Sequence, residues 1–105
     1  LDPKMREKLE DELAAAIEAE YRRQRADLLA ALQLWLRDVW VQTRTTAEDL
    51  LHLNPLASLT STVAARLSPA EALDNVRVIE QLHRMLNSNV QEALTLEVGF
   101  LKLKL

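Results

Sequence analysis

The chain has 105 residues, of which 49% are hydrophobic and 28% charged, and its formal net charge is −3. This composition is typical of one globular domain, and a single glycine with three prolines argues against both disorder and a turn-rich β fold. The acidic balance excludes a strong attraction to nucleic acid or anionic membranes, and the lack of cysteine excludes disulfides and thiolate metal sites. We therefore expect one cytoplasmic, all-α domain over residues 1–105, a compact bundle of about five helices with protein partners.

The first predicted helix covers residues 3–44, because no helix-breaking residue follows Pro3 until well beyond them. Asp2 and Pro3 are typical of an N-cap and a first helical position. At about 1.5 Å per residue this helix would be about 60 Å long, roughly twice the width of a compact domain. It must therefore project from the body or bend near residues 21–27, where Asp27 would cap a second helix. Apolar residues recur at every fourth position of its first half: Met5, Leu9, Leu13, Ile17 and Tyr21.

Two weaker helices are predicted next. Thr45 and Glu48 have the spacing of a capping box, which indicates a short helix that ends before Asn54-Pro55. Residues 56–66 then form a third helix with a weaker pattern.

The clearest helix start in the chain is the stretch "LSPAE". Ser68 is the expected N-cap, Pro69 opens the first turn, and Glu71 closes a capping box. This helix should end near residues 87–89. Asn89 is the expected cap of a last helix, whose final residues alternate as L-K-L-K-L and leave a strand-like tail open.

Catalytic chemistry has little support in the sequence. One glycine cannot build a phosphate-binding loop, and no serine lies in a nucleophile motif. Glu80 and His83 match the Glu-x-x-His spacing of helical di-metal sites, but such a site needs that motif twice, and one copy favours a histidine at the edge of the core. His52, near Glu48 and Asp49, forms a looser grouping. We expect no enzyme activity, no metal and no cofactor.

Two surface features remain. The basic run at residues 22–25 is flanked by acidic residues, which favours a solvated, salt-bridged helix surface over a phosphate-binding patch. Trp35 falls on the apolar stripe, whereas Trp40, five residues later, is rotated by about 140° around the helix. Trp35 is therefore expected in the core, and Trp40 is the better candidate for an interface.

Four motifs together resemble the C-terminal helical domain of the bacterial DNA polymerase III delta-prime subunit, a clamp-loader subunit. The resemblance covers roughly residues 28–105. Its motifs are the W-L-R-D of residues 35–38, the N-P of residues 54–55 and the L-S of residues 67–68 before a long helix. The fourth is an ending similar to N-x-N-x-x-L-x-L-E followed by leucines, matched here by Asn87, Asn89, Leu94, Leu96 and Glu97. The chain departs from that pattern at Val90, where the family usually has proline, and at Gly99, which interrupts the final leucine run.

The resemblance implies a collar domain, through which clamp-loader subunits assemble into a ring. The chain would then be the C-terminal part of a longer AAA+-type subunit and would contact the delta and gamma/tau subunits. Candidate interface residues are Trp40, Phe100, Leu101 and Leu103. A gamma/tau collar and an unrelated helical adaptor are the alternatives, and an intact upstream phosphate loop would favour gamma/tau.

Overall fold

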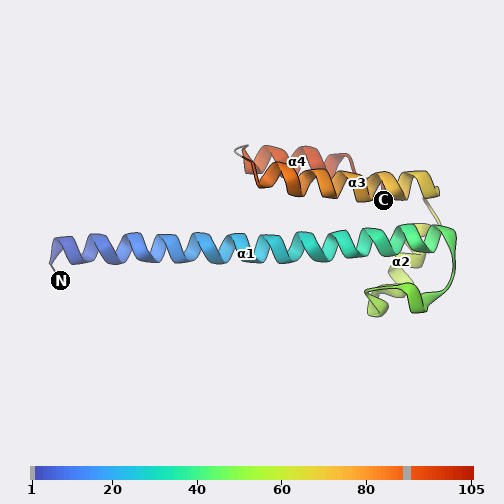
Figure 1. The fold of residues 1–105 in the computed structure, drawn as a ribbon, viewed down its shortest axis with the longest axis horizontal. Coiled ribbons are helices and arrows are strands. Elements are labelled where there is room, and N and C mark those ends of the chain that lie inside the picture. Colours follow the sequence, from blue (N-terminus) through green and yellow to red (C-terminus); the bar gives the residue numbers. More distant parts are fainter. Residues whose placement is uncertain (1, 89–90) are drawn as a thin grey trace.

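The computed structural model describes residues 2–88 and 91–105, and its regular structure in those ranges is entirely helical (Figure 1). This confirms the all-α class. The α-helices are α1 (Pro3–Arg44), α2 (Ala57–Ala64), α3 (Pro69–Leu86) and α4 (Glu92–Leu101), and the short 3₁₀ turns are η1 (Glu48–Leu50) and η2 (Asn54–Leu56). None of these helices is both long and apolar enough to cross a membrane.

Helix α1 is continuous, so the projecting helix is the correct alternative for residues 3–44. Asp2 caps it as predicted, because its carboxylate accepts the backbone N–H of Lys4 at 3.1 Å. Asp27 does not cap a second helix and instead pairs with Arg23 at 3.1 Å. The longest dimension of the molecule is 64 Å, and its radius of gyration of 18.7 Å exceeds the roughly 13 Å of a compact domain of this length. The helices form a bundle, as expected, but the projecting half of α1 means that the molecule is not compact.

The body forms around the C-terminal half of α1 (Figure 1). Helix α3 packs along α1, α4 packs against α3, and α2 packs against α1 near its end. One core cluster consists of Leu29, Leu36, Val76, Ile79 and Leu82. The second consists of Val39, Val63, Ala64 and Ala72. The free N-terminal half of α1 extends away from both.

The capping box at the start of α3 is confirmed. The hydroxyl of Ser68 accepts the N–H of Glu71 at 3.1 Å, and the N–H of Ser68 donates to the Glu71 carboxylate, also at 3.1 Å. The hydrogen bond from the backbone N–H of Ser68 is the main cause that lowers the pKa of the Glu71 carboxyl group, and the Ser68 side chain and Lys104 add to the effect. The local sequence alone therefore determines where this helix begins.

The short helix predicted between residues 45 and 53 is wrong, and the described chain consequently has four α-helices instead of about five. Only the single turn η1 forms there. The predicted capping box is absent because the hydroxyl of Thr45 accepts the N–H of Ala47, at 3.2 Å, and the turn has no side-chain cap. The N–H groups of His52 and Leu53 then bond to a side chain of α1 instead of continuing a helix.

That side chain is Asp38, which is completely buried. Its two carboxylate oxygens each accept one backbone N–H, from His52 and from Leu53, both at 2.9 Å. The buried charge is therefore satisfied by strong hydrogen bonds, as burial of a carboxylate requires. Asp38 thus ties the loop after α1 back onto that helix.

The last residues form no strand within the described chain. The side chain of Asn75, which is buried in α3, makes two hydrogen bonds with the backbone of Lys104, accepting its N–H at 2.9 Å and donating to its carbonyl at 2.7 Å. The predicted cap Asn89 lies outside the described residues. Helix α4 has Gln91 as its N-cap, without a side-chain hydrogen bond.

Candidate assembly surface

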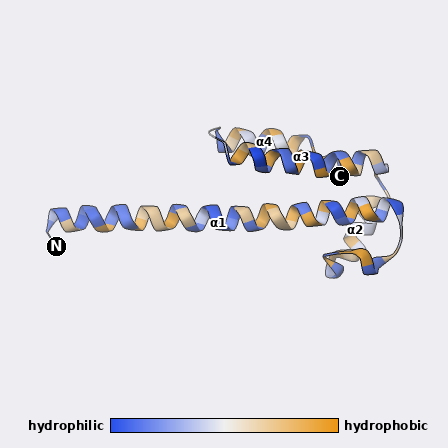
Figure 2. Ribbon diagram, viewed as in Figure 1, coloured by the Kyte–Doolittle hydropathy of each residue, from blue (hydrophilic) through white to orange (hydrophobic). Residues whose placement is uncertain are grey.

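Helix α4 consists mostly of apolar residues (Figure 2), and several of their side chains are exposed. Leu94, Val98 and Leu101 follow the i, i+4, i+7 spacing that places side chains on one face of a helix. Their exposed fractions are 56%, 42% and 79%, and Phe100 beside them is 45% exposed. Grouped apolar exposure of this kind is typical of a surface that another protein covers.

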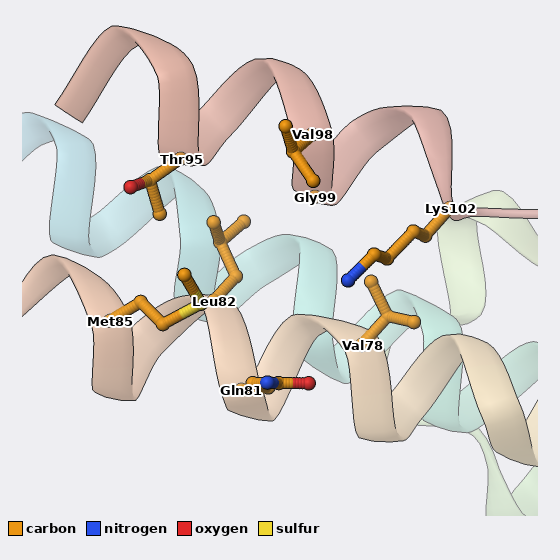
Figure 3. Close-up of a pocket in the computed structure, with 8 residues that line it drawn as sticks. All are labelled: Val78, Gln81, Leu82, Met85, Thr95, Val98, Gly99 and Lys102. Atoms are coloured by element: carbon orange, nitrogen blue, oxygen red, sulfur yellow. The ribbon is translucent and has the colours of Figure 1, made fainter. Parts of the chain in front are cut away.

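Gly99 fixes how closely α4 approaches α3. A β-carbon built there would lie 3.0 Å from Cδ1 of Leu82, which belongs to the core. Figure 3 shows Leu82 pointing at Gly99 from α3, with Thr95 one turn earlier on the same helix as Gly99. The buried positions of α4 are Thr95 and Gly99, and Leu96 packs against the core, while Leu94, Val98 and Leu101 are left on the outer side.

The space between α3 and α4 is too small for a substrate. The pocket drawn in Figure 3 has a volume of about 30 Å³, which holds about one water molecule. We therefore treat α4 as a contact surface and not as the wall of a binding pocket.

Ionic contacts with α1 hold the beginning of α4. Glu92 pairs with Arg25 at 3.1 Å and accepts a hydrogen bond from the hydroxyl of Tyr21. The Tyr21 hydrogen bond lowers the pKa of the Glu92 carboxyl group, with a further contribution from Arg25. The same hydrogen bond, followed by desolvation, raises the pKa of the Tyr21 hydroxyl. This contact joins α4 to α1 where the free half of α1 begins.

The predicted interface residues of the C-terminal segment divide between two environments. Phe100 and Leu101 are exposed, as a subunit contact requires. Leu103 is only partly exposed and packs against the core cluster that contains Leu82. It therefore has less surface to offer a partner than the other two.

The predicted difference in burial between the two tryptophans is wrong. Trp35 and Trp40 are both partly buried, and both pack against both core clusters. The reason is that α3 and α2 each pack against α1, so its buried surface is wider than one stripe. Trp35 also donates its indole N–H to the hydroxyl of Thr60 in α2, at 3.0 Å.

The exposed part of Trp40 lines a shallow hollow between α1 and α3 with a volume of about 360 Å³. Arg37 and Glu80 lie at its edge and form an ion pair at 3.6 Å. The hollow is also lined by Val41, His52, Leu73 and Val76. A partner that enters this hollow would therefore contact Trp40.

The residues considered for metal binding do not come together. Among the described residues no group of three or more metal-ligating side chains could hold an ion. Glu80 pairs with Arg37, while His83 is partly buried and its Nε2 atom has no hydrogen-bond partner among residues 2–88 and 91–105. His52 contacts Asp38, with 3.2 Å between Nδ1 and Oδ1, and not the nearby acidic residues of η1.

The basic run at residues 22–25 is a salt-bridged surface, as predicted. Arg22 pairs with Glu18 at 3.0 Å, and Arg25 pairs with Glu92. Arg23 pairs with two acidic residues of α1, Glu20 and Asp27. Each arginine of the run is thus matched by a carboxylate, which leaves little free positive charge for a phosphate backbone.

Two residues that hold the fold together through buried hydrogen bonds, Asn75 and Asp38, were not predicted from the sequence. Asn75 lies on the buried stripe of α3 beside Val76, and a polar residue at such a position is a readable signal of an internal hydrogen bond. Asp38 gave no such signal, because its hydrogen-bond partners belong to the loop at residues 51–53 and not to a neighbouring helix.

In comparisons with known proteins, the chain matches no family model, no curated protein and no solved structure. The functional assignment therefore depends on the residues themselves and on the motifs they form.

Proposed function

We propose that this chain is a non-catalytic assembly domain, similar to the collar of the delta-prime subunit in bacterial clamp loaders, and that it acts in DNA replication. The observation that carries the proposal is the exposed face of α4, formed by Leu94, Val98 and Leu101. Leaving three large aliphatic side chains exposed on one short helix is unfavourable in water, and a partner protein that covers them removes this cost.

The positions of the motif residues support the same proposal. Asp38, from the W-L-R-D segment, anchors the loop that leads to Asn54-Pro55, and Trp35 bonds to α2 directly after that loop. Ser68 then starts α3. The resembling residues thus build the junctions between helices, which is where a shared fold would require them.

The delta and gamma/tau subunits are the proposed partners, in the cytoplasm. The α4 face is the main contact in this proposal, with Phe100 at its edge. Trp40 is a second contact, through the hollow beside Arg37. An unrelated helical adaptor is the alternative, and it would use the same surfaces for a partner outside replication.

The test is a binding measurement between this chain and purified delta and gamma/tau subunits. Leu101→Glu places a charge on the most exposed residue of the α4 face, and it should weaken binding by more than about tenfold, because an unpaired charge in a covered apolar surface is costly. Leu59→Glu is the control, because Leu59 is 52% exposed on α2, away from that face.

Both variants should keep the helical spectrum and melting temperature of the unsubstituted chain, since both positions are exposed. Equal binding by both variants and by the original chain would move the contact away from α4. Binding to no loader subunit by any of the three would overturn the replication proposal.

A further inference from the structure

The free half of α1 carries a row of exposed apolar residues that the described part of the chain leaves uncovered. Met5, Leu9, Leu13 and Ile17 are 57%, 50%, 62% and 61% exposed. An isolated amphipathic helix gains most of its stability from packing of its apolar face. This half of α1 therefore requires a partner helix or remains only weakly stabilised.

Apolar residues are placed symmetrically before and after Leu13, and the charged residues beyond them are basic on one side and acidic on the other. Leu9 and Ile17 lie four residues before and after it, within about 40° of the same direction around the helix. Arg6 and Glu20 lie seven residues before and after it, within about 20° of that direction. We call Arg6, Leu9, Leu13, Ile17 and Glu20 the α1 seam.

We propose that the α1 seam pairs with the α1 seam of a second copy of this chain, in antiparallel orientation, with the two Leu13 side chains at the centre. Reversal about Leu13 places Leu9 opposite Ile17 of the second copy. It also places Arg6 opposite Glu20, so that each end of the pair joins a basic and an acidic residue.

The charges along the helix favour this orientation over a parallel one. Residues 10–20 contain five acidic and no basic residues, while residues 4–8 contain three basic residues and one acidic residue. In a parallel pair Glu10, beside the seam, and Glu20, within it, would each lie level with their own copies, which is unfavourable. In the antiparallel pair Glu10 lies level with Ala16, and Glu20 lies level with Arg6.

The surface at the inner end of the seam has room for the second copy. A shallow hollow of about 380 Å³ lies along Ala16, Ile17, Glu20, Tyr21 and Gln24. In the proposed register this hollow faces residues 2–10 of the second copy, including Met5 and Leu9. A membrane surface is a poorer occupant, because the acidic residues of this half of α1 are repelled by anionic lipids.

The proposal does not depend on the proposed function, because the α1 seam and the α4 face lie on different helices and are tested by different variants. The first experiment is sedimentation of the full 105-residue chain over a range of concentrations. We expect a reversible monomer–dimer equilibrium. Leu13→Glu should raise the dimer dissociation constant by more than about tenfold, because the two introduced carboxylates meet at the centre.

Leu28→Glu is the control, since Leu28 is 70% exposed on the same helix but outside the seam. It should leave the dissociation constant unchanged. The charge pairs provide a second set of variants that do not depend on the fold tolerating a change at Leu13. Arg6→Glu and Glu20→Arg should each weaken the dimer, and the double variant should restore it.

Orientation is read from disulfide formation, which is unambiguous because the chain has no cysteine of its own. A mixture of Arg6→Cys and Glu20→Cys chains should form mainly the mixed disulfide. Predominant Arg6→Cys homodimers would establish a parallel pair and overturn the proposal. So would a chain that stays monomeric at all concentrations, a dimer that tolerates Leu13→Glu, or a seam that binds only vesicles or a loader subunit.

Discussion

Replacing Asp38 with alanine should be one of the most destabilising substitutions in the chain. Asp38 is fully buried, and its carboxylate accepts the N–H groups of His52 and Leu53 at 2.9 Å. A hydrogen bond to a charged group contributes about 1.5–3 kcal/mol, so the loss of both should cost about 3 kcal/mol or more. For a domain of this size that corresponds to a fall in melting temperature of about 12–24 °C.

The assay is guanidinium denaturation followed by circular dichroism, with Asp74→Ala as the control. Asp74 is exposed in the middle of α3, so both substitutions gain similar helix propensity while only one removes buried hydrogen bonds. Asp38→Asn keeps one carbonyl acceptor and should lose roughly half as much stability. Equal denaturation midpoints for Asp38→Ala and Asp74→Ala would refute the anchoring role given to Asp38.

Three further substitutions or titrations test the helix contacts. Ser68→Ala removes the cap of α3 and should cost about 1 kcal/mol, whereas Ser68→Thr should keep most of the stability, as read from denaturation midpoints. Gly99→Val should lower the free energy of unfolding by about 1–3 kcal/mol, because the valine side chain would overlap Leu82. If Gly99→Val were as stable as Gly99→Ala, the close approach of α4 to α3 would be contradicted. Tyr21 is the only tyrosine, so its ultraviolet absorbance reports its ionisation directly, and its pKa should lie above the ordinary value and fall in Glu92→Gln. Folding raises the pKa of Tyr21, so the stability from this contact is present at pH values below the pKa of tyrosine in the unfolded chain. This stability is lost as the pH rises through the pKa of Tyr21 in the folded chain. A Tyr21 titration unaffected by Glu92→Gln would exclude the hydrogen bond.

Features set by neighbouring residues were predictable from the sequence. The caps at Asp2 and Ser68 depend on contacts within three residues, and the structure contains both. The all-α class follows in the same way from the scarcity of glycine and proline.

Features that depend on distant packing were not predictable. The helix expected after Thr45 does not form, because Asp38, on another element, accepts the N–H groups of His52 and Leu53 that would continue it. Trp40 was assigned to the surface because one apolar stripe was assumed, whereas two helices pack against α1. Phe100 and Leu101, predicted as interface residues, are exposed, yet nothing in the local pattern could reveal that Leu103 packs on the core.

The most direct test of the assembly proposal is the native mass of mixtures of this chain with purified delta and gamma/tau subunits. The proposal predicts a complex that contains the chain together with loader subunits, and loss of the chain from that complex when Leu101→Glu replaces the original. A mixture in which the chain keeps the mass it has alone, while the loader subunits associate with one another, would contradict the proposal.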